Sequence, residues 1–184
     1  MKDIFLLFGL LFISSTSFSQ SKSAPIEVTP AIAKKINAEI SKQAGQLKAK
    51  LTTDKEEAIV IEFTLDTFQI EKYQEKYIDY DWSTAGMRAA TYDAAAKYDS
   101  LLNKYYKKLL AVLKQADKTI LINAQKSWIA FRDSELKLNG VVGKDEYSGG
   151  GTMQQLIDAD NYLDLVKQRT FQIYQHYIRA TQTY

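Results

Sequence analysis

The sequence predicts an all-α protein of about five helices arranged as a helical bundle. Only two prolines and eight glycines interrupt its 184 residues, which leaves long stretches without the turn residues that a β sandwich needs. Apolar residues recur three and four positions apart through most of the chain, as the buried face of a helix requires. The hydrophobic content of 46% is that of a globular protein with a packed core.

The N-terminus has the pattern of a secretory signal. A lysine at position 2 precedes a ten-residue apolar segment at 4–13, and small and polar residues follow up to Gln20. Ten apolar residues are too few to cross a bilayer but suit a signal peptide. We expect a signal peptide over residues 1–19 and no lipid anchor, because no cysteine follows it. The protein is then exported, periplasmic or secreted, without a membrane span.

Two helices are expected before the main bundle. After a disordered leader at 20–28, Thr29 and Pro30 provide an N-cap and a first helical residue, and the first helix reaches about residue 51. Residues 53–56, Thr-Asp-Lys-Glu, have the form of a capping box that opens the second helix. Part of that helix, 54–70, also alternates like a strand. No turn residue interrupts the segment, so helix is the interpretation. Residues 29–81 thus form an N-terminal helical extension to a domain at 82–184.

A long antiparallel hairpin is expected next, with helices at about 84–115 and 117–139. Its first helix carries an apolar face ending near Val112, and its second carries Leu121, Ala124, Trp128 and Phe131. Folding the chain back near residue 116 brings three polar or aromatic pairs together. These are Asp99 with Arg132, Asn103 with Trp128, and Tyr106 with Gln125; Asp133 follows in the same pattern. We expect these pairs to fix the register of the two helices.

The last helix is expected to begin at Thr152, after an exposed loop at 140–152. This loop contains Lys144, Tyr147, Ser148 and a run of three glycines at 149–151. No lysine follows the glycines in the phosphate-loop arrangement, so a nucleotide site is not expected there. An exposed loop on a rigid hairpin is instead suited to contact another protein.

Composition excludes most catalytic classes. The chain has no cysteine and one histidine, so thiol catalysis, a zinc site and a serine–histidine triad lack their residues. The net charge is +2 and the lysines are spread over several helices, which does not indicate a nucleic-acid groove. We therefore expect no enzyme, no cofactor and no metal site. Glu62 and Asp66, four residues apart, are interpreted as part of an acidic helix face, with nine acids against three lysines over 54–81.

The motifs taken together resemble the LprI-like family, which is named after a bacterial lysozyme inhibitor. The matching residues are Thr84, Met87, Asp99, Leu102, Asn103, Tyr106, Ala124, Gln125, Trp128, Ile129, Phe131, Arg132, Asp133, Gly150, Gly151, Thr152, Arg169 and Thr170. The resemblance covers about residues 80–175. Members of the family commonly place cysteines at the positions of Ala90, Leu136 and Asn161, so this chain lacks the family's disulfides.

The resemblance implies an all-helical exported protein that binds another protein, with a lysozyme as the concrete partner. A lysozyme cuts its substrate with two carboxylates in a cleft. The loop at 140–152 is expected to block that cleft, with Lys144, Tyr147 and Ser148 as candidate hydrogen-bond donors. Glu62 and Asp66 are candidates for steering a basic lysozyme. The alternative is a periplasmic binding or assembly module without an enzyme target, whose partner surface lies on residues 29–81.

Overall fold

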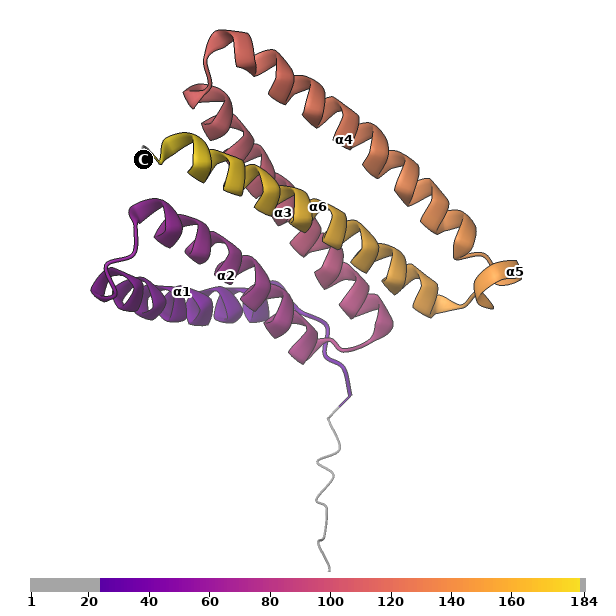
Figure 1. The fold of residues 1–184 in the computed structure, drawn as a ribbon. Coiled ribbons are helices and arrows are strands. Elements are labelled where there is room, and N and C mark those ends of the chain that lie inside the picture. Colours follow the sequence, from indigo (N-terminus) through magenta and orange to yellow (C-terminus); the bar gives the residue numbers. More distant parts are fainter. Residues whose placement is uncertain (1–23, 183–184) are drawn as a thin grey trace, which may run out of the picture.

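The computed structural model describes residues 24–182, and within them the chain forms α-helices joined by short connections (Figure 1). The helices are α1 (Pro30–Thr53), α2 (Ala58–Tyr80), α3 (Thr84–Val112), α4 (Gln115–Val142), the single turn α5 (Asp145–Ser148) and α6 (Thr152–Thr181). The described residues contain no strand, so the all-α prediction is confirmed and the ambiguous segment 54–70 belongs mainly to α2. The expected signal peptide lies outside the described residues. Of the expected leader, residue 26 is attached to the end of α2, where Ile26 N donates to the carbonyl of Tyr80 at 2.8 Å.

Two of the predicted helix starts are confirmed by side-chain caps. Thr29 Oγ1 accepts a hydrogen bond from Ile32 N at 3.4 Å, and Ser83 Oγ accepts one from Gly86 N at 3.0 Å. Each cap satisfies one of the N–H groups that the first turn of a helix leaves unpaired.

The predicted capping box at 53–56 is wrong. Helix α1 continues through Thr53, and the chain then reverses at Lys55, which has a φ of 59°. Helix α2 follows with Glu57 as its N-cap and no side-chain cap. Thr53 therefore ends a helix, and its hydroxyl donates to the carbonyl of Ala49 at 3.0 Å. The sequence favours helix on both sides of the turn, so the residue pattern did not locate the boundary between α1 and α2.

Helix α3 lies at the centre of the bundle, packed between α2 and α6. It runs parallel to α6, because Thr91 contacts Asp160, the backbone of Tyr98 meets Thr170, and Tyr105 meets Tyr174 in the same order along both helices. Small residues make this approach close. Ala90, Ala94 and Ala95 on α3 and Ala159 on α6 are at most 2% exposed.

Helices α2 and α3 form an antiparallel hairpin. Glu62 pairs with Lys108, Asp66 with Lys104, Tyr98 bonds Glu71, and Thr91 bonds Gln74, so the order along α2 is reversed along α3.

An aromatic cluster fills the space among α2, α3 and α6. Phe63 stacks on Tyr174 with ring centroids 3.7 Å apart and meets Tyr105 and Phe171 edge-on at 5.2 and 5.0 Å. Residues of the 29–81 extension thus share one core with the helices that follow.

The predicted pairing along α3 and α4 is wrong. The two helices follow one another and run in opposite directions, but they diverge after their connection (Figure 1), and α4 packs lightly against α6. Arg132 bonds its neighbour Asp133 at 2.7 Å, and Asn103 donates to Asp99 within α3. Helix α6 occupies the flank of α3 that the sequence assigned to α4.

The expected core face of α4 is consequently mostly outside the core. Leu121 is the one buried residue of α4, Trp128 is half-buried, and Ala124 is exposed. Phe131 is 53% exposed. Helix α4 also begins earlier than expected, at Gln115, so Asp117 lies in its first turn.

The close α3–α6 packing makes a testable prediction about stability. Replacing Ala95, which has no exposed surface, by leucine forces extra atoms into a filled core and should lower the free energy of unfolding by about 1–3 kcal/mol or more. The matched control is Ala96→Leu, one position along the same helix and exposed, which should change stability by less than about 0.5 kcal/mol. Urea denaturation followed by circular dichroism measures both. Equal effects of the two substitutions would contradict the packing.

Candidate functional site

The end of the molecule at α5 carries a group of exposed apolar side chains. We call residues 138–157 the tip; they comprise the end of α4, all of α5 and the start of α6, which project together (Figure 1). Its exposed large hydrophobics are Leu138, Val141, Val142, Tyr147, Met153 and Ile157. Single exposed apolar residues are ordinary, whereas several gathered at one end are typical of a protein-binding surface.

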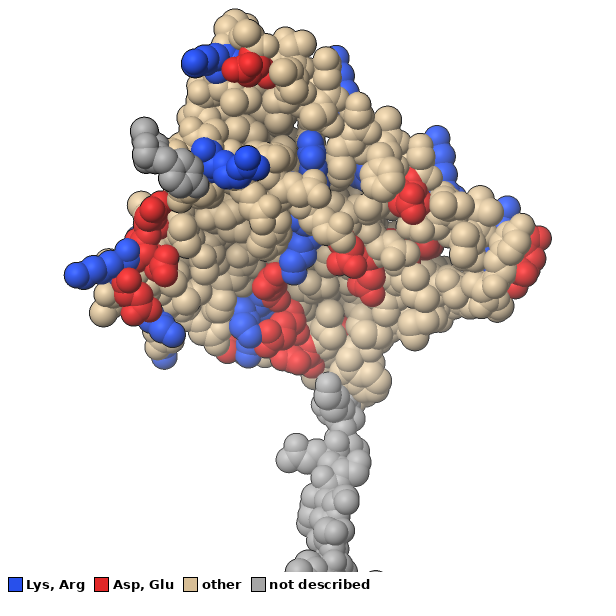
Figure 2. All heavy atoms as spheres, viewed as in Figure 1, with Lys and Arg blue, Asp and Glu red and all other residues tan. Residues whose placement is uncertain are grey.

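Charged side chains accompany these apolar residues. Lys144, Asp145 and Glu146 lie in or next to α5, and all three are exposed. Figure 2 shows acidic and basic side chains at the end of the molecule where Figure 1 places α5. The tip therefore combines apolar area with charges of both signs.

Three glycines set the shape of the tip. Gly149, Gly150 and Gly151 have φ values of 75°, 66° and 92°, a region that residues with a side chain rarely adopt. At Gly150 a Cβ atom would also overlap the carboxylate of Asp145. The predicted loop 140–152 is thus shorter and more ordered than expected, with α4 extending to Val142 and α5 inside it.

The last helix begins at Thr152, as expected, but without a side-chain cap. Thr152 is the first residue of α6, and the cap position is held by Gly151, which has no side chain to bond the helix.

The three candidate donors of the tip differ in availability. Tyr147 is 66% exposed, and Lys144 is exposed beside it. Ser148 already uses its hydroxyl within the tip, because Oγ lies 2.9 Å from the carbonyl of Gly143 and accepts from Gly150 N at 3.1 Å. Lys144 and Tyr147 are therefore the residues able to meet a partner, and Ser148 holds the turn.

The candidate acidic residues lie on a different face, between α2 and α3. Glu62 binds Lys104 Nζ at 2.8 Å and Lys108 Nζ at 2.5 Å, and Asp66 also pairs with Lys104. Burial raises the pKa of Glu62, but the hydrogen bonds and charges of the two lysines outweigh it and hold the pKa below its usual range. These carboxylates cross-link two helices. Among the described residues, no group of three or more acidic or histidine side chains could hold a metal ion.

The polar motif of α4 meets α6 instead of α3. Arg169 on α6 donates from Nε to Gln125 Oε1 at 3.0 Å, and its guanidinium lies 5.8 Å from the ring centre of Trp128. Arg132 approaches the same ring at 5.4 Å. Burial lowers the pKa of Arg169. The cation–π contact between Arg169 and Trp128 thus joins the two helices where few other contacts do, whereas Arg132 belongs to the same helix as the ring.

Sequence reasoning missed Arg169 as the partner of Gln125, although Arg169 and Thr170 belong to the recognised pattern. Thr170 is fully buried and donates to the carbonyls of Val166 at 2.8 Å and Tyr98 at 3.2 Å, which ties α6 to α3. Tyr106, expected opposite Gln125, instead packs against the central core. The recognised residues therefore hold the helices in place.

The ion pairs of Glu62 make a prediction about pH dependence. Because its pKa is depressed in the folded state, the stability that Glu62 adds is present above the ordinary carboxyl pKa and is lost as the pH falls through the folded-state pKa. Glu62→Gln should therefore lower the free energy of unfolding at pH 7 by roughly 0.5–1 kcal/mol, a small effect because the pair is partly exposed. The difference from the unmodified protein should shrink by pH 3.

Glu56→Gln is the matched control, since Glu56 is exposed at the α1–α2 turn. Urea titrations at both pH values measure the two variants. A Glu62→Gln effect that is unchanged at pH 3 would refute the ion-pair interpretation.

The comparisons with known proteins agree with the pattern in the sequence. The family model described as lysozyme inhibitor LprI matches residues 79–173, which run from the end of α2 to the second half of α6. No curated protein and no solved structure matches the chain. Within the described residues, no helix is long and apolar enough to cross a membrane. The match covers more than half of the chain and the motifs quoted above, and the chain therefore belongs to the LprI family.

Proposed function

We propose that this protein is an exported protein-binding module that inhibits a lysozyme through the tip at 138–157. Membership of a family described by lysozyme inhibition supports the class of partner. The exposed tip supports the location of the binding surface. This observation carries the proposal, because the tip offers apolar area, a tyrosine and charges on one projecting element. Export is part of the proposal and rests on the signal-like segment at 1–19.

The chemistry of the tip fits a cleft with two carboxylates. Lys144 Nζ and Tyr147 OH are donors that can bond carboxylate oxygens, and an ammonium–carboxylate bond is stronger than a neutral one. Tyrosine is enriched among the residues that carry most of the energy of protein interfaces. Leu138, Val142 and Met153 would then cover the rim of the cleft and exclude water.

The ordered turn of the tip supports binding without a large entropic cost. Gly150 lies against the carboxylate of Asp145, and the hydroxyl of Ser148 bonds the backbone on both sides of α5. A loop already held in one conformation loses little freedom on association. Asp145 and Glu146 add negative charge that favours the approach of a basic lysozyme. Glu62 and Asp66 contribute less to this field, because lysines neutralise them locally.

The inhibition assay tests the proposal directly. The purified protein, mixed at micromolar concentration with a chicken-type lysozyme, should slow the lysis of bacterial cell walls. Tyr147→Ser and Lys144→Ser should each weaken inhibition by about tenfold or more, because each removes a donor from the contact.

Val112→Ser is the matched control. Val112 is also exposed, at 45%, but it is the last residue of α3 and lies near the start of α4, whereas the tip includes the end of α4. This substitution should leave inhibition unchanged. No loss of lysozyme activity at a tenfold excess of the protein, or equal effects of all three substitutions, would refute inhibition by the tip. Residues 29–81 would then remain as the surface for a partner that is not an enzyme.

A further inference from the structure

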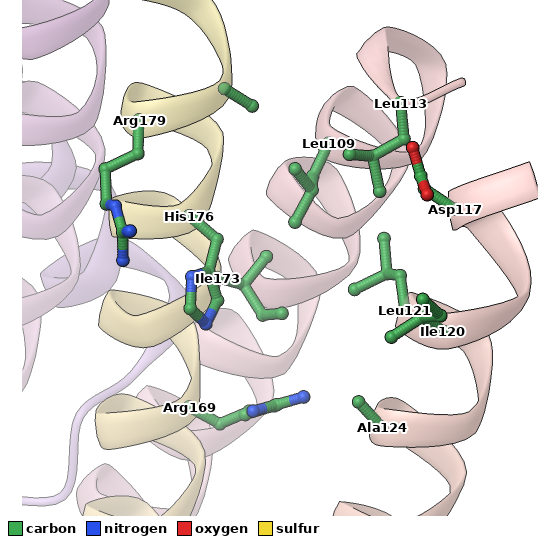
Figure 3. Close-up of a pocket in the computed structure, with 11 residues that line it drawn as sticks. Leu109, Leu113, Asp117, Ile120, Leu121, Ala124, Arg169, Ile173, His176 and Arg179 are labelled. Carbon is green, nitrogen blue, oxygen red and sulfur yellow. The ribbon is translucent and has the colours of Figure 1, made fainter.

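An apolar groove opens at the end of the molecule opposite the tip. It lies between the end of α3, the start of α4 and the second half of α6, with a volume of about 580 Å³ (Figure 3). Its apolar lining consists of Leu109, Leu113, Ile120, Leu121, Ala124, Ile173 and Ala180. The volume falls within the roughly 300–1,000 Å³ of sites that bind small organic ligands. The groove exists because α4 stands away from α3.

The polar groups around the groove are unevenly distributed. Helix α6 supplies Arg169, His176 and Arg179, and α4 supplies Asp117. In Figure 3, the Arg169 side chain extends from α6 toward Ala124, whereas Asp117 lies at the far end beside Leu113. One wall of the groove is therefore cationic, and the acidic group is at a distance from Arg169.

Arg169 is a partly buried cation without a carboxylate partner among the described residues. Its side-chain hydrogen bonds go to the neutral amide oxygens of Gln125 at 3.0 Å and Gln172 at 3.2 Å. Burial disfavours its charge and lowers its pKa. Arg179, on the same helix, also has no ion pair within the described part of the chain, but its side chain lies on the other side of α6 from that of Arg169 (Figure 3). A bound anion would offset the cost of the buried charge.

We propose that the groove binds a single-chain amphiphile with a carboxylate head, of the fatty-acid type. The acyl chain lies against the leucines and isoleucines of α3, α4 and α6, where it removes exposed apolar surface from water. The carboxylate lies at the α6 wall beside Arg169, where the guanidinium N–H groups can bond its oxygens. The groove and the tip occupy opposite ends of α4, so this site is independent of lysozyme inhibition.

Isothermal titration calorimetry with decanoate, below its micelle-forming concentration, tests the proposal. Decanoate should bind one molecule per chain. Decan-1-ol, which has the same chain length and no charge, should bind about tenfold more weakly, and acetate should not bind. Arg169→Gln should weaken decanoate binding by about tenfold. Arg179→Gln removes a cation of the same helix whose side chain lies on the other side of α6, and should weaken binding less.

Two further substitutions separate the groove from general surface charge. Ala124→Phe fills the groove while keeping its cations and should weaken decanoate binding by about tenfold or more. Lys126→Gln removes an exposed cation two positions along α4 and should leave binding unchanged. Equal affinities for decanoate and decan-1-ol, or undiminished binding to Ala124→Phe, would overturn the proposal. So would sedimentation that shows a dimer dissociated by Ala124→Phe together with no binding of decanoate, because the groove would then be covered by a second copy.

Discussion

The parallel packing of α3 along α6 is the constraint on which the other helices depend. Four alanines with almost no exposed surface bring the two backbones close together, and Thr170 adds a hydrogen bond from one helix to the backbone of the other. Once this pair is formed, α2 covers one side of it through the rings around Phe63. Helix α4 must then travel the length of the molecule to connect α3 to a parallel partner. Its exposure, the projecting tip and the open groove all follow from that connection.

The residues by which the family is recognised hold the helices in that arrangement. Gln125 and Trp128 attach α4 to Arg169, and Thr170 attaches α6 to α3. A polar group bonded within the fold is not available to a partner, which is why the proposed binding residues, Lys144 and Tyr147, lie outside these contacts. Arg169 is the exception, because its hydrogen bonds within the described residues go to neutral amides and it lines a groove. Arg169 thus both attaches α6 to α4 and takes part in the proposed binding site.

Local patterns in the sequence predict the elements but not which elements pack together. The apolar stripe through Ala90, Tyr98 and Leu109 identifies the buried face of α3 correctly, and the caps at Thr29 and Ser83 follow from local chemistry. The opposing order of polar residues in α3 and α4 fits an antiparallel pair, yet it cannot exclude a closer neighbour far along the chain. The alanines of α3 favour such a neighbour, and nothing in a local pattern says that it is α6. The tip could be located from its glycines, whereas the groove could not, because it arises from the separation of two helices that the sequence predicts to be in contact.

The position of Phe63 has a consequence for how the family region is delimited. The matched segment runs from residue 79 to 173, but Tyr105 and Phe171 within it are covered by a ring from α2, outside the match. A protein consisting of the matched segment alone would leave these two aromatic side chains without their cover. It would need a substitute cover, such as an association with another molecule. In this chain the N-terminal helices supply that cover from within, so the unit that folds is larger than the unit that the family pattern marks.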